Sequence, residues 1–358
     1  MYRKNILNIE PYRPGKPVKE VERELGIAGS YKLASNENLL GPSPRALLVI
    51  KKHLKNLNYY PDGSCYYLRN ALSERLKINP DQIVLGNGSD ELLQIIGLTF
   101  INPGDEAIIS PEGFIRYPMI VNIMDGKNVF VNMKEHIYDL KAMLDHVNEK
   151  TKIIFIANPN NPTGTAVYKN EMDDFINKIS DNVVVVLDEA YYEFTDKNKF
   201  PDSLQYLNNN KKVIVLRTFS KIYGLAGLRI GYALTTKKIA EYMNKVRCPF
   251  NVNSLAELGA LSALDDDKYV AKTIKLINKE KKYLYSKIDK INIKYLPSET
   301  NFILINFGAK AAYIFNSLLQ EGIIVRPMGM YNLPEWLRVT IGTHPMNQKF
   351  IEKLKVLL

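Results

Sequence analysis

The sequence predicts an α/β fold with a sheet of mainly parallel strands. Short runs rich in β-branched residues alternate with helix-length segments between about residues 45 and 265, and four of these runs end in polar or glycine-rich residues. Such alternation is typical of parallel sheets whose two faces are covered by helices. After about residue 266 a long helical pattern leads into further strands, which predicts a second, smaller α+β domain.

The individual elements follow from these patterns. Buried strands are expected at residues 81–86, 106–110, 127–131, 152–157, 183–190 and 212–218, with helices at 90–100, 140–149 and 169–179. Beyond residue 266, strands at 301–307 and 337–342 are separated by a helix at 311–321. We expect a large domain over residues 41–265, a small domain over 266–358, and an N-terminal arm over 1–40 that packs on the small domain.

Composition limits the class of protein. Hydrophobic residues make up 46% of the 358 residues and charged residues 24%, which is typical of a soluble globular protein. The apolar runs are only as long as a strand, and no apolar signal-peptide core follows Met1, so no membrane association is expected. The two cysteines, Cys65 and Cys248, form neither a disulfide framework nor a metal site, which favours a cytoplasmic location.

The net charge of +10 does not by itself indicate a nucleic-acid partner. The lysines are spread along the chain, and the densest group, in residues 277–294, alternates with apolar positions at helical spacing. This spacing favours the exposed face of an amphipathic helix over a stripe that follows phosphates. No nucleic-acid partner is therefore expected.

The strand ends predict an anion site. In open α/β sheets, ligands bind outside the carboxyl ends of the strands. The sequence GNGSDELL after the first strand places glycines and a serine where a helix begins, so that free backbone N–H groups and the helix dipole could hold a phosphate. The alternative is a simple turn with Ser89 or Asp90 as the helix N-cap. The donors Thr218, Ser220 and Arg229 favour the phosphate.

Two further strand ends carry residues suited to covalent catalysis. Asp188 ends a fully apolar strand, where a carboxylate needs a partner, and Lys221 follows the next strand. A lysine in a closed pocket has a lowered pKa and can form Schiff bases. The alternatives are a structural aspartate, and a surface lysine or an ion pair between the two. Asn161, in the compact turn ANPNNPTG, adds a rigid amide, and a cis bond at Pro162 is possible. Together these groups fit pyridoxal 5′-phosphate.

The motifs resemble those of the histidinol-phosphate aminotransferase family, within the fold-type I pyridoxal-phosphate aminotransferases. The likeness extends over nearly the whole chain and is carried by these segments in order: PYRPGKPVKEVERELG, KLASNEN, GPSP, YYPDGSCYYLRNAL, IVLGNGSDELL, NPNNPTG, LDEAYYEF, RTFSKIYGLAGLRIGY, VRPM and LRVTIGT. The resemblance implies an aspartate-aminotransferase-like fold with a mainly parallel seven-stranded sheet. One departure is Leu39, where the family usually has proline.

The resemblance also implies roles for individual residues. Lys221 would be the Schiff-base lysine, Asp188 would hold the cofactor ring nitrogen protonated, and Tyr191 and Asn161 would bind the ring oxygen. The phosphate would be surrounded by a group of small, polar and charged residues: Gly88, Ser89, Asp90, Thr218, Ser220 and Arg229. Phe114 would stack on the ring, although its segment lacks the usual Pro-Thr-aromatic form and a core aromatic is the alternative.

The remaining roles concern the substrate and a second subunit. Arg338 would bind a carboxylate or the substrate's phosphate, Arg326 would add a second charge or form a structural ion pair, and Asn36 would lie in a segment that closes over the substrate. Tyr60 would reach the phosphate in a neighbouring subunit, which implies a homodimer.

The expected reaction transfers an amino group from histidinol phosphate to 2-oxoglutarate, giving imidazole acetol phosphate and glutamate in histidine biosynthesis. Three alternatives stay open: an aromatic amino-acid aminotransferase, a threonine-phosphate decarboxylase, and a regulator that senses the cofactor. The last would carry a DNA-binding module, and no helix-turn-helix pattern precedes residue 41.

Overall fold

The computed structural model describes residues 2–7, 9–11 and 15–358. Its largest element is a seven-stranded sheet in the order β2-β8-β7-β6-β5-β3-β4. The strands are β2 (Ile83–Gly86), β3 (Glu106–Ile109), β4 (Lys127–Phe130), β5 (Thr151–Ala157), β6 (Val184–Asp188), β7 (Val213–Thr218) and β8 (Gly231–Leu234). Only β8 runs against the others, since it is antiparallel to β2 and β7 while the pairs from β7 to β4 are parallel. The predicted mainly parallel sheet is confirmed.

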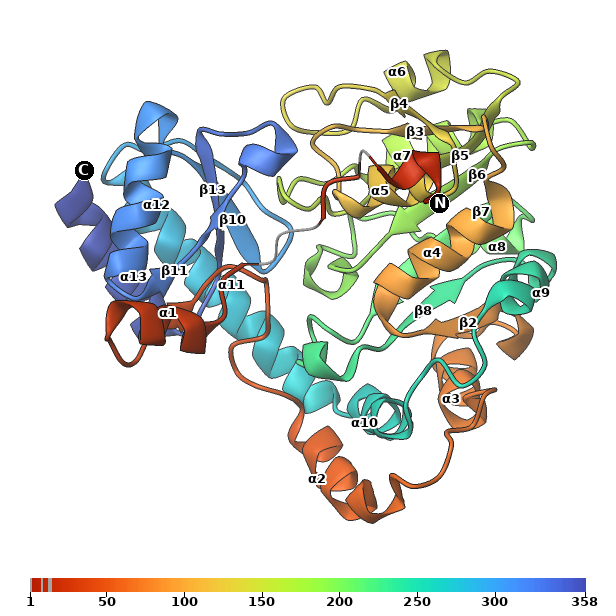
Figure 1. The fold of residues 1–358 in the computed structure, drawn as a ribbon, viewed down its shortest axis with the longest axis horizontal. Coiled ribbons are helices and arrows are strands. Elements are labelled where there is room, and N and C mark those ends of the chain that lie inside the picture. The colour runs from red at the N-terminus through yellow and green to blue at the C-terminus, as the bar shows by residue number, and fades with distance from the viewer. Residues whose placement is uncertain (1, 8, 12–14) are drawn as a thin grey trace.

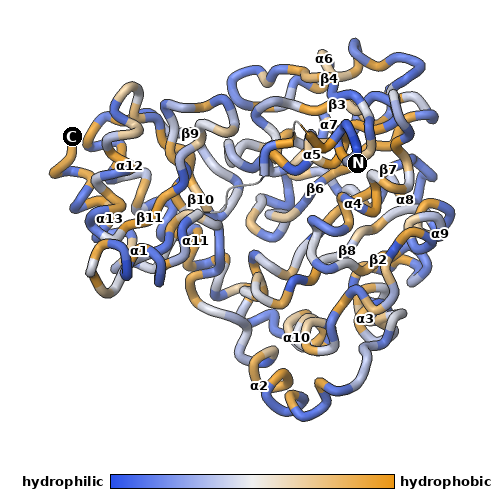
Figure 2. The backbone as a smooth tube through the Cα atoms, in the orientation of Figure 1, coloured by the Kyte–Doolittle hydropathy of each residue, from blue (hydrophilic) through white to orange (hydrophobic). Residues whose placement is uncertain are grey.

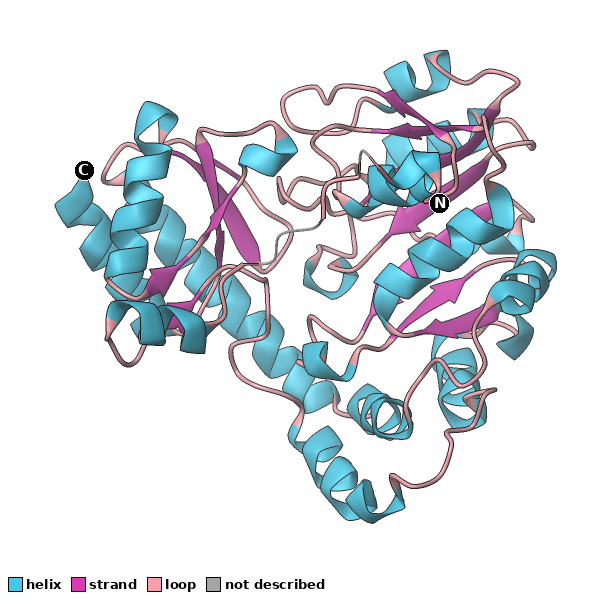
Figure 3. Cartoon of the chain, in the orientation of Figure 1, coloured by secondary structure: helices cyan, strands magenta, loops and turns pink. Residues whose placement is uncertain are grey.

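Helices cover both faces of this sheet. The side chains of β6 alternate: Val184 and Val186 join one hydrophobic core, and Val185 and Leu187 join the other. The first core includes α4 (Gly88–Phe100), α5 (Arg116–Ile123) and α9 (Lys237–Val246), and the second includes α6 (Leu140–Asp145), α7 (Lys169–Lys178) and α8 (Leu204–Asn208). Because both faces are buried, the strands read as continuous apolar runs. Figure 3 shows the strands between layers of helix, and Figure 2 shows hydrophobic stretches along them.

A second sheet forms the C-terminal part of the chain. Its order is β12-β13-β10-β9, with β9 (Tyr295–Leu296), β10 (Phe302–Asn306), β12 (Arg326–Pro327) and β13 (Trp336–Thr340). The helices α12 (Ala311–Gln320) and α13 (His344–Leu357) belong to the same part, and the long α11 (Asp267–Asp289) leads into it (Figure 1). Buried residues recur along α11 at Ile277, Glu280, Leu284 and Ile288, which confirms the amphipathic helix predicted there.

The N-terminal segment contacts both parts. The strand β1 (Tyr31–Lys32) pairs in parallel with β11 (Ile323–Ile324), after the helix α1 (Val18–Leu25). Earlier in the chain, Asn5 Nδ2 donates to the Asn122 carbonyl on α5 over 2.9 Å. Residues 1, 8 and 12–14 of the predicted arm lie outside the described residues. The division into an arm and two domains stays a prediction.

Three helices lie below the sheet in Figure 1: α2 (Pro44–His53), α3 (Tyr66–Leu76) and α10 (Ser254–Leu264). Some element bounds differ from those predicted. The helix expected at 140–149 ends at Asp145, and β8 is an additional strand that was not predicted. Within the described ranges, no helix has both the length and the apolar character needed to cross a membrane.

Candidate active site

A cavity of about 510 Å³ lies where the carboxyl ends of the parallel strands meet the second sheet. Thirteen residues of the predicted site line it: Asn36, Ser89, Asp90, Phe114, Asn161, Asp188, Tyr191, Thr218, Ser220, Lys221, Arg229, Arg326 and Arg338. The structure therefore brings together residues from five strand ends and from both sheets. Gly88 lies immediately beside this lining, and Tyr60 lies elsewhere.

The beginning of α4 has the features of an anion site. The N-cap residue is Asn87, and its side chain forms no capping hydrogen bond. Ser89 and Asp90 lie inside the helix, so the alternative in which one of them is the N-cap is wrong. Gly88 has a φ of +78°, and a Cβ there would collide with the Arg229 guanidinium. Glycine thus allows the arginine to approach the uncapped N–H groups, where an anion is favoured.

Donors from the β7–β8 connection surround the same point. Arg229 Nη1 donates to Ser220 Oγ over 3.4 Å, and the Ser220 backbone N–H donates to Thr218 Oγ1 over 3.1 Å. Thr218 and Ser220 are buried, while Arg229 is exposed. A cluster of hydroxyl and guanidinium donors beside a helix N-terminus suits a phosphate group.

Asp188 is a buried carboxyl held by two donors. The Tyr117 hydroxyl donates to Asp188 Oδ2 over 3.1 Å, and the Ala190 backbone N–H donates to Oδ1 over 3.2 Å. Burial raises the pKa of Asp188 to about 6, against the opposing effect of these hydrogen bonds. A carboxyl with this pKa is poised to hold a proton together with a basic nitrogen near neutral pH.

The pKa of Lys221 is shifted downward, in the opposite direction to that of Asp188. Burial, and then the positive charge of Arg338, lower the pKa of Lys221 to about 8. Its Nζ donates to the Ser35 carbonyl oxygen over 3.2 Å and lies 5.7 Å from the centre of the Tyr191 ring. At pH 7–8 the neutral fraction of the Lys221 amine is therefore larger than that of an ordinary lysine. The neutral amine is the nucleophilic form.

Hydrogen bonds hold the Asn161 turn and Tyr191 in place. Both proline bonds of the turn, Asn158–Pro159 and Asn161–Pro162, are cis. Asn161 Oδ1 accepts a hydrogen bond from Arg338 Nη1. The Tyr191 hydroxyl accepts one from Asn36 Nδ2 over 2.9 Å, and burial raises the pKa of Tyr191 to about 12, so the hydroxyl keeps its proton. Asn36 is 1% exposed and is engaged by the protein.

Two arginines face the cavity from the second sheet. Arg326 and Arg338 are opposite one another in the antiparallel pair β12–β13, and both are buried. Arg338 Nη2 donates to the Ala34 carbonyl over 2.8 Å, whereas its buried Nε has no hydrogen-bond partner within the described part of the protein. Two neighbouring guanidinium groups with an unsatisfied donor favour an anionic ligand.

The last two predicted residues differ in their surroundings. Phe114 is half-buried on the cavity wall, with its ring edge-on to Tyr117 at 5.7 Å. Tyr60 is 83% exposed and stacks on Phe250 at 5.0 Å. It lines a second cavity of about 310 Å³ beside α2 and α10, away from the first.

Tyr117 and Arg116 are among the residues at the site that were not predicted. Tyr117 lies in the first turn of α5, three residues after Phe114, whose carbonyl accepts a 3.0 Å hydrogen bond from the Tyr117 backbone N–H. Arg116 lines the cavity, and its Nε forms an ion pair with Asp90 Oδ1 at 2.6 Å. No pattern in the sequence links residues 90 and 116.

The family model, the similar sequences and the similar solved structures all match aminotransferases. Residues 29–354 match the family described as aminotransferase class I and II. The chain is 46% identical to histidinol-phosphate aminotransferase 2 of Carboxydothermus hydrogenoformans (100% of this chain, 99% of that one) and 44% identical to histidinol-phosphate aminotransferase of Caldicellulosiruptor saccharolyticus (100% of both). A crystal structure of histidinol-phosphate aminotransferase from Sinorhizobium meliloti in complex with pyridoxal-5′-phosphate superposes with a TM-score of 0.92 at 28% identity, covering 100% of this chain and 98% of that one.

Proposed function

The chain belongs to the class I and II aminotransferase family, and from this premise we propose that it transfers the amino group of histidinol phosphate to 2-oxoglutarate. The observation that carries the proposal is the single cavity that holds Lys221, Asp188 and the uncapped start of α4. The relatives named above support the choice of substrate. The cofactor is pyridoxal 5′-phosphate.

The residues of the cavity fit this cofactor. The start of α4, with Thr218, Ser220 and Arg229, suits a phosphate dianion, and the glycine at position 88 lets the Arg229 guanidinium lie beside it. Asp188 suits a protonated ring nitrogen, and the donors Tyr191 and Asn161 suit a ring oxygen. Phe114 provides an aromatic face for the ring.

Each residue then has a chemical task. When bound, pyridoxal phosphate supplies an aldehyde that captures amines and a ring that withdraws electrons from the substrate carbon. Lys221 Nζ would hold the aldehyde at rest and, once released, would take the proton from the substrate's amino-bearing carbon. Asp188 would hold the proton at the ring nitrogen, and its burial keeps water from competing.

The substrate's phosphate would be bound by Arg338 and Arg326. The unsatisfied Nε of Arg338 is available for an additional charge-assisted hydrogen bond. We expect Arg338→Gln to lower kcat/KM for histidinol phosphate by about 10- to 100-fold. Phenylalanine, assayed in parallel, tests the aromatic aminotransferase alternative, and carbon dioxide release from threonine phosphate tests the decarboxylase alternative. A preference for either substrate would contradict the proposal.

Absorbance spectra test the role of Lys221. The purified protein should absorb near about 410–430 nm when the cofactor is joined to lysine. Lys221→Ala should lose this lysine-linked form and lower kcat by about 10³-fold. The matched control is Lys281→Ala, because burial also lowers the pKa of Lys281. This control should keep the lysine-linked absorbance. Identical spectra from the Lys221→Ala variant and the unaltered protein would refute the assignment.

We also propose that the chain works as a homodimer. An exposed apolar surface lies on α2, the segment after it and the start of α3, and includes Leu48, Leu54, Leu57, Tyr59, Tyr60 and Tyr67. Clustered exposed apolar residues are typical of protein interfaces. A second copy seated on this surface would bring its Tyr60 to the phosphate of this chain. Light scattering at micromolar concentration should give twice the 40.9 kDa mass of one chain. The cytoplasmic location stays a prediction.

A further inference from the structure

A tight turn beside the active site has unfavourable backbone geometry. Lys134 and Ile137 exchange both backbone hydrogen bonds, each 2.9 Å long, so Glu135 and His136 occupy the two central positions. Both have positive φ angles, 51° and 65°. Turns of this kind favour Asn-Gly, because left-handed angles strain residues that carry larger side chains. The sequence therefore accepts strain at a place where a common dipeptide would remove it.

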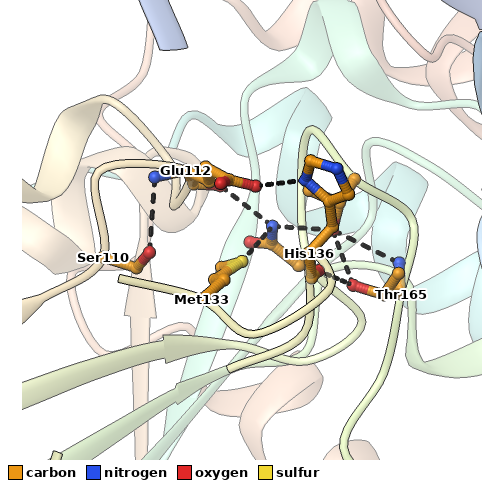
Figure 4. A network of polar contacts seen from close by, with 7 residues as sticks. Ser110, Glu112, Met133, His136 and Thr165 are labelled. Carbon is orange, nitrogen blue, oxygen red and sulfur yellow. Dashed lines mark hydrogen bonds and ion pairs between the residues drawn. The ribbon is translucent and has the colours of Figure 1, made fainter. Parts of the chain in front are cut away.

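The side chain of His136 gives a reason for this strain. Its Nδ1 pairs with Glu112 Oε2 at 2.6 Å, and the two side chains are 22% and 20% exposed. Its ring lies edge-on to Trp336, with the ring centres 5.0 Å apart. Its backbone carbonyl accepts a 2.6 Å hydrogen bond from Thr165 Oγ1. One residue thus contacts three segments that are distant in the sequence, and Figure 4 shows the contacts with Glu112 and Thr165.

Each contacted segment carries a residue of the proposed site. Glu112 precedes Phe114 by two residues, and its carbonyl accepts a 3.0 Å hydrogen bond from Asn160 Nδ2, the neighbour of Asn161. Trp336 precedes Arg338 by two residues on β13, so both side chains are on the same face of that strand.

We infer that His136 is a positioning residue that fixes the segments of Phe114, Asn161 and Arg338 relative to one another. This inference rests on the proposed function, because the three residues matter only if they hold the cofactor and the substrate. Small displacements of binding groups lower rates strongly, so the loss of this contact should reduce activity although His136 itself does not line the cavity.

The turn permits a test that separates positioning from stability. The double substitution Glu135→Asn, His136→Gly installs the favoured Asn-Gly turn and removes the imidazole. We expect the melting temperature to stay unchanged or rise, because strain is relieved. We also expect kcat/KM to fall about 10-fold. The cofactor should dissociate faster, and its visible circular dichroism band should weaken.

Three further variants complete the design. Glu135→Asn alone keeps His136 and should retain both activity and the dichroism band. His136→Asn keeps a donor for Glu112 and tolerates the positive φ, so it should recover part of the loss. His146→Gly, at the exposed C-cap histidine of α6 whose Nδ1 bonds the Ala142 carbonyl, is the matched control.

The inference is overturned if the double variant keeps the cofactor dissociation rate and the dichroism band of the unaltered protein. It is also overturned if the variant only lowers the melting temperature. Neither result would affect the proposed function, which fails instead if the unaltered protein does not bind the cofactor through Lys221.

Discussion

The Tyr117 hydroxyl donates a 3.1 Å hydrogen bond to Asp188 Oδ2 from a fully buried ring that stacks on Phe155. The bond favours the ionised form of a carboxyl whose burial favours the neutral form. Tyr117 therefore adjusts the pH range over which Asp188 carries its charge.

This relationship predicts an effect of pH on cofactor binding. In the cofactor-free protein the pKa of Asp188 is about 6, so affinity for the cofactor should fall as the pH drops below 6 and the carboxylate is protonated. Tyr117→Phe removes a donor, which raises this pKa further, so the loss of affinity should begin at higher pH. Titrations with the cofactor between about pH 5 and 8 measure this. The control is Tyr138→Phe. It also removes a buried hydroxyl, but that hydroxyl donates to Asn160 and not to Asp188. Coinciding pH profiles for Tyr117→Phe and the unaltered protein would disprove the effect.

A second prediction concerns the reactivity of Lys221. The rate at which the cofactor-free protein captures pyridoxal, trapped with borohydride, should rise with pH around a midpoint of about 8. Arg338→Gln should move the midpoint upward, because the guanidinium charge helps to lower this pKa. Lys221→Arg is the control, because it lacks the lysine amine and should trap no pyridoxal at this position. A midpoint near the ordinary lysine value of about 10.4 would show that the amine is not perturbed.

Gly164, at the end of the Asn161 turn, should tolerate no side chain. Its φ is +80°, and a Cβ would lie 2.9 Å from Ser298 Cβ. Gly104 has a similar φ of +86° but open space around it. Gly104→Ala should lower the free energy of unfolding by about 1–2 kcal/mol through the backbone alone. Gly164→Ala should lower it by about 1–3 kcal/mol more through the clash. Denaturant unfolding of the two variants compares these effects, and equal losses would mean that the contact with Ser298 relaxes freely.

Mixed dimers test whether Tyr60 acts across the interface. A subunit with Tyr60→Ala and one with Lys221→Ala, each weakly active alone, should regain activity when unfolded and refolded together. A hybrid contains one site with both residues intact, so an equal mixture should reach about a quarter of normal activity. If Tyr60 acts within its own chain, every hybrid site is defective and mixing restores nothing.

Much of this arrangement could be predicted from the sequence, for identifiable reasons. Apolar runs such as 183–187 and the glycine-rich or polar residues after each strand are local signals, and parallel strands bring their ends to one edge. For this reason the sequence alone places Asp188, Lys221 and Ser89 at one site, and all three line the same cavity.

What could not be predicted depends on contacts between distant segments. The strand β8 begins at Gly231, and glycine is depleted in strands, so the local sequence does not favour one there. The pairs Tyr117–Asp188 and Arg116–Asp90 join residues that no spacing rule relates. The left-handed turn at Glu135–His136 contradicts the local preference, so only the surrounding structure could reveal it.

The reversed direction of β8 limits how the catalytic edge can be redesigned. Thr218 and Gly231 lie opposite one another in the β7–β8 pair, so the connection between them leaves and re-enters the sheet at the same edge. Lys221 lies near the start of this connection and Arg229 near its end, so both belong to one loop whose two ends are fixed in the sheet. Inserting or deleting a residue between these two residues would change the position of the amine relative to the guanidinium. Engineering the protein to bind another cofactor would therefore require replacing residues 219–230 as one segment.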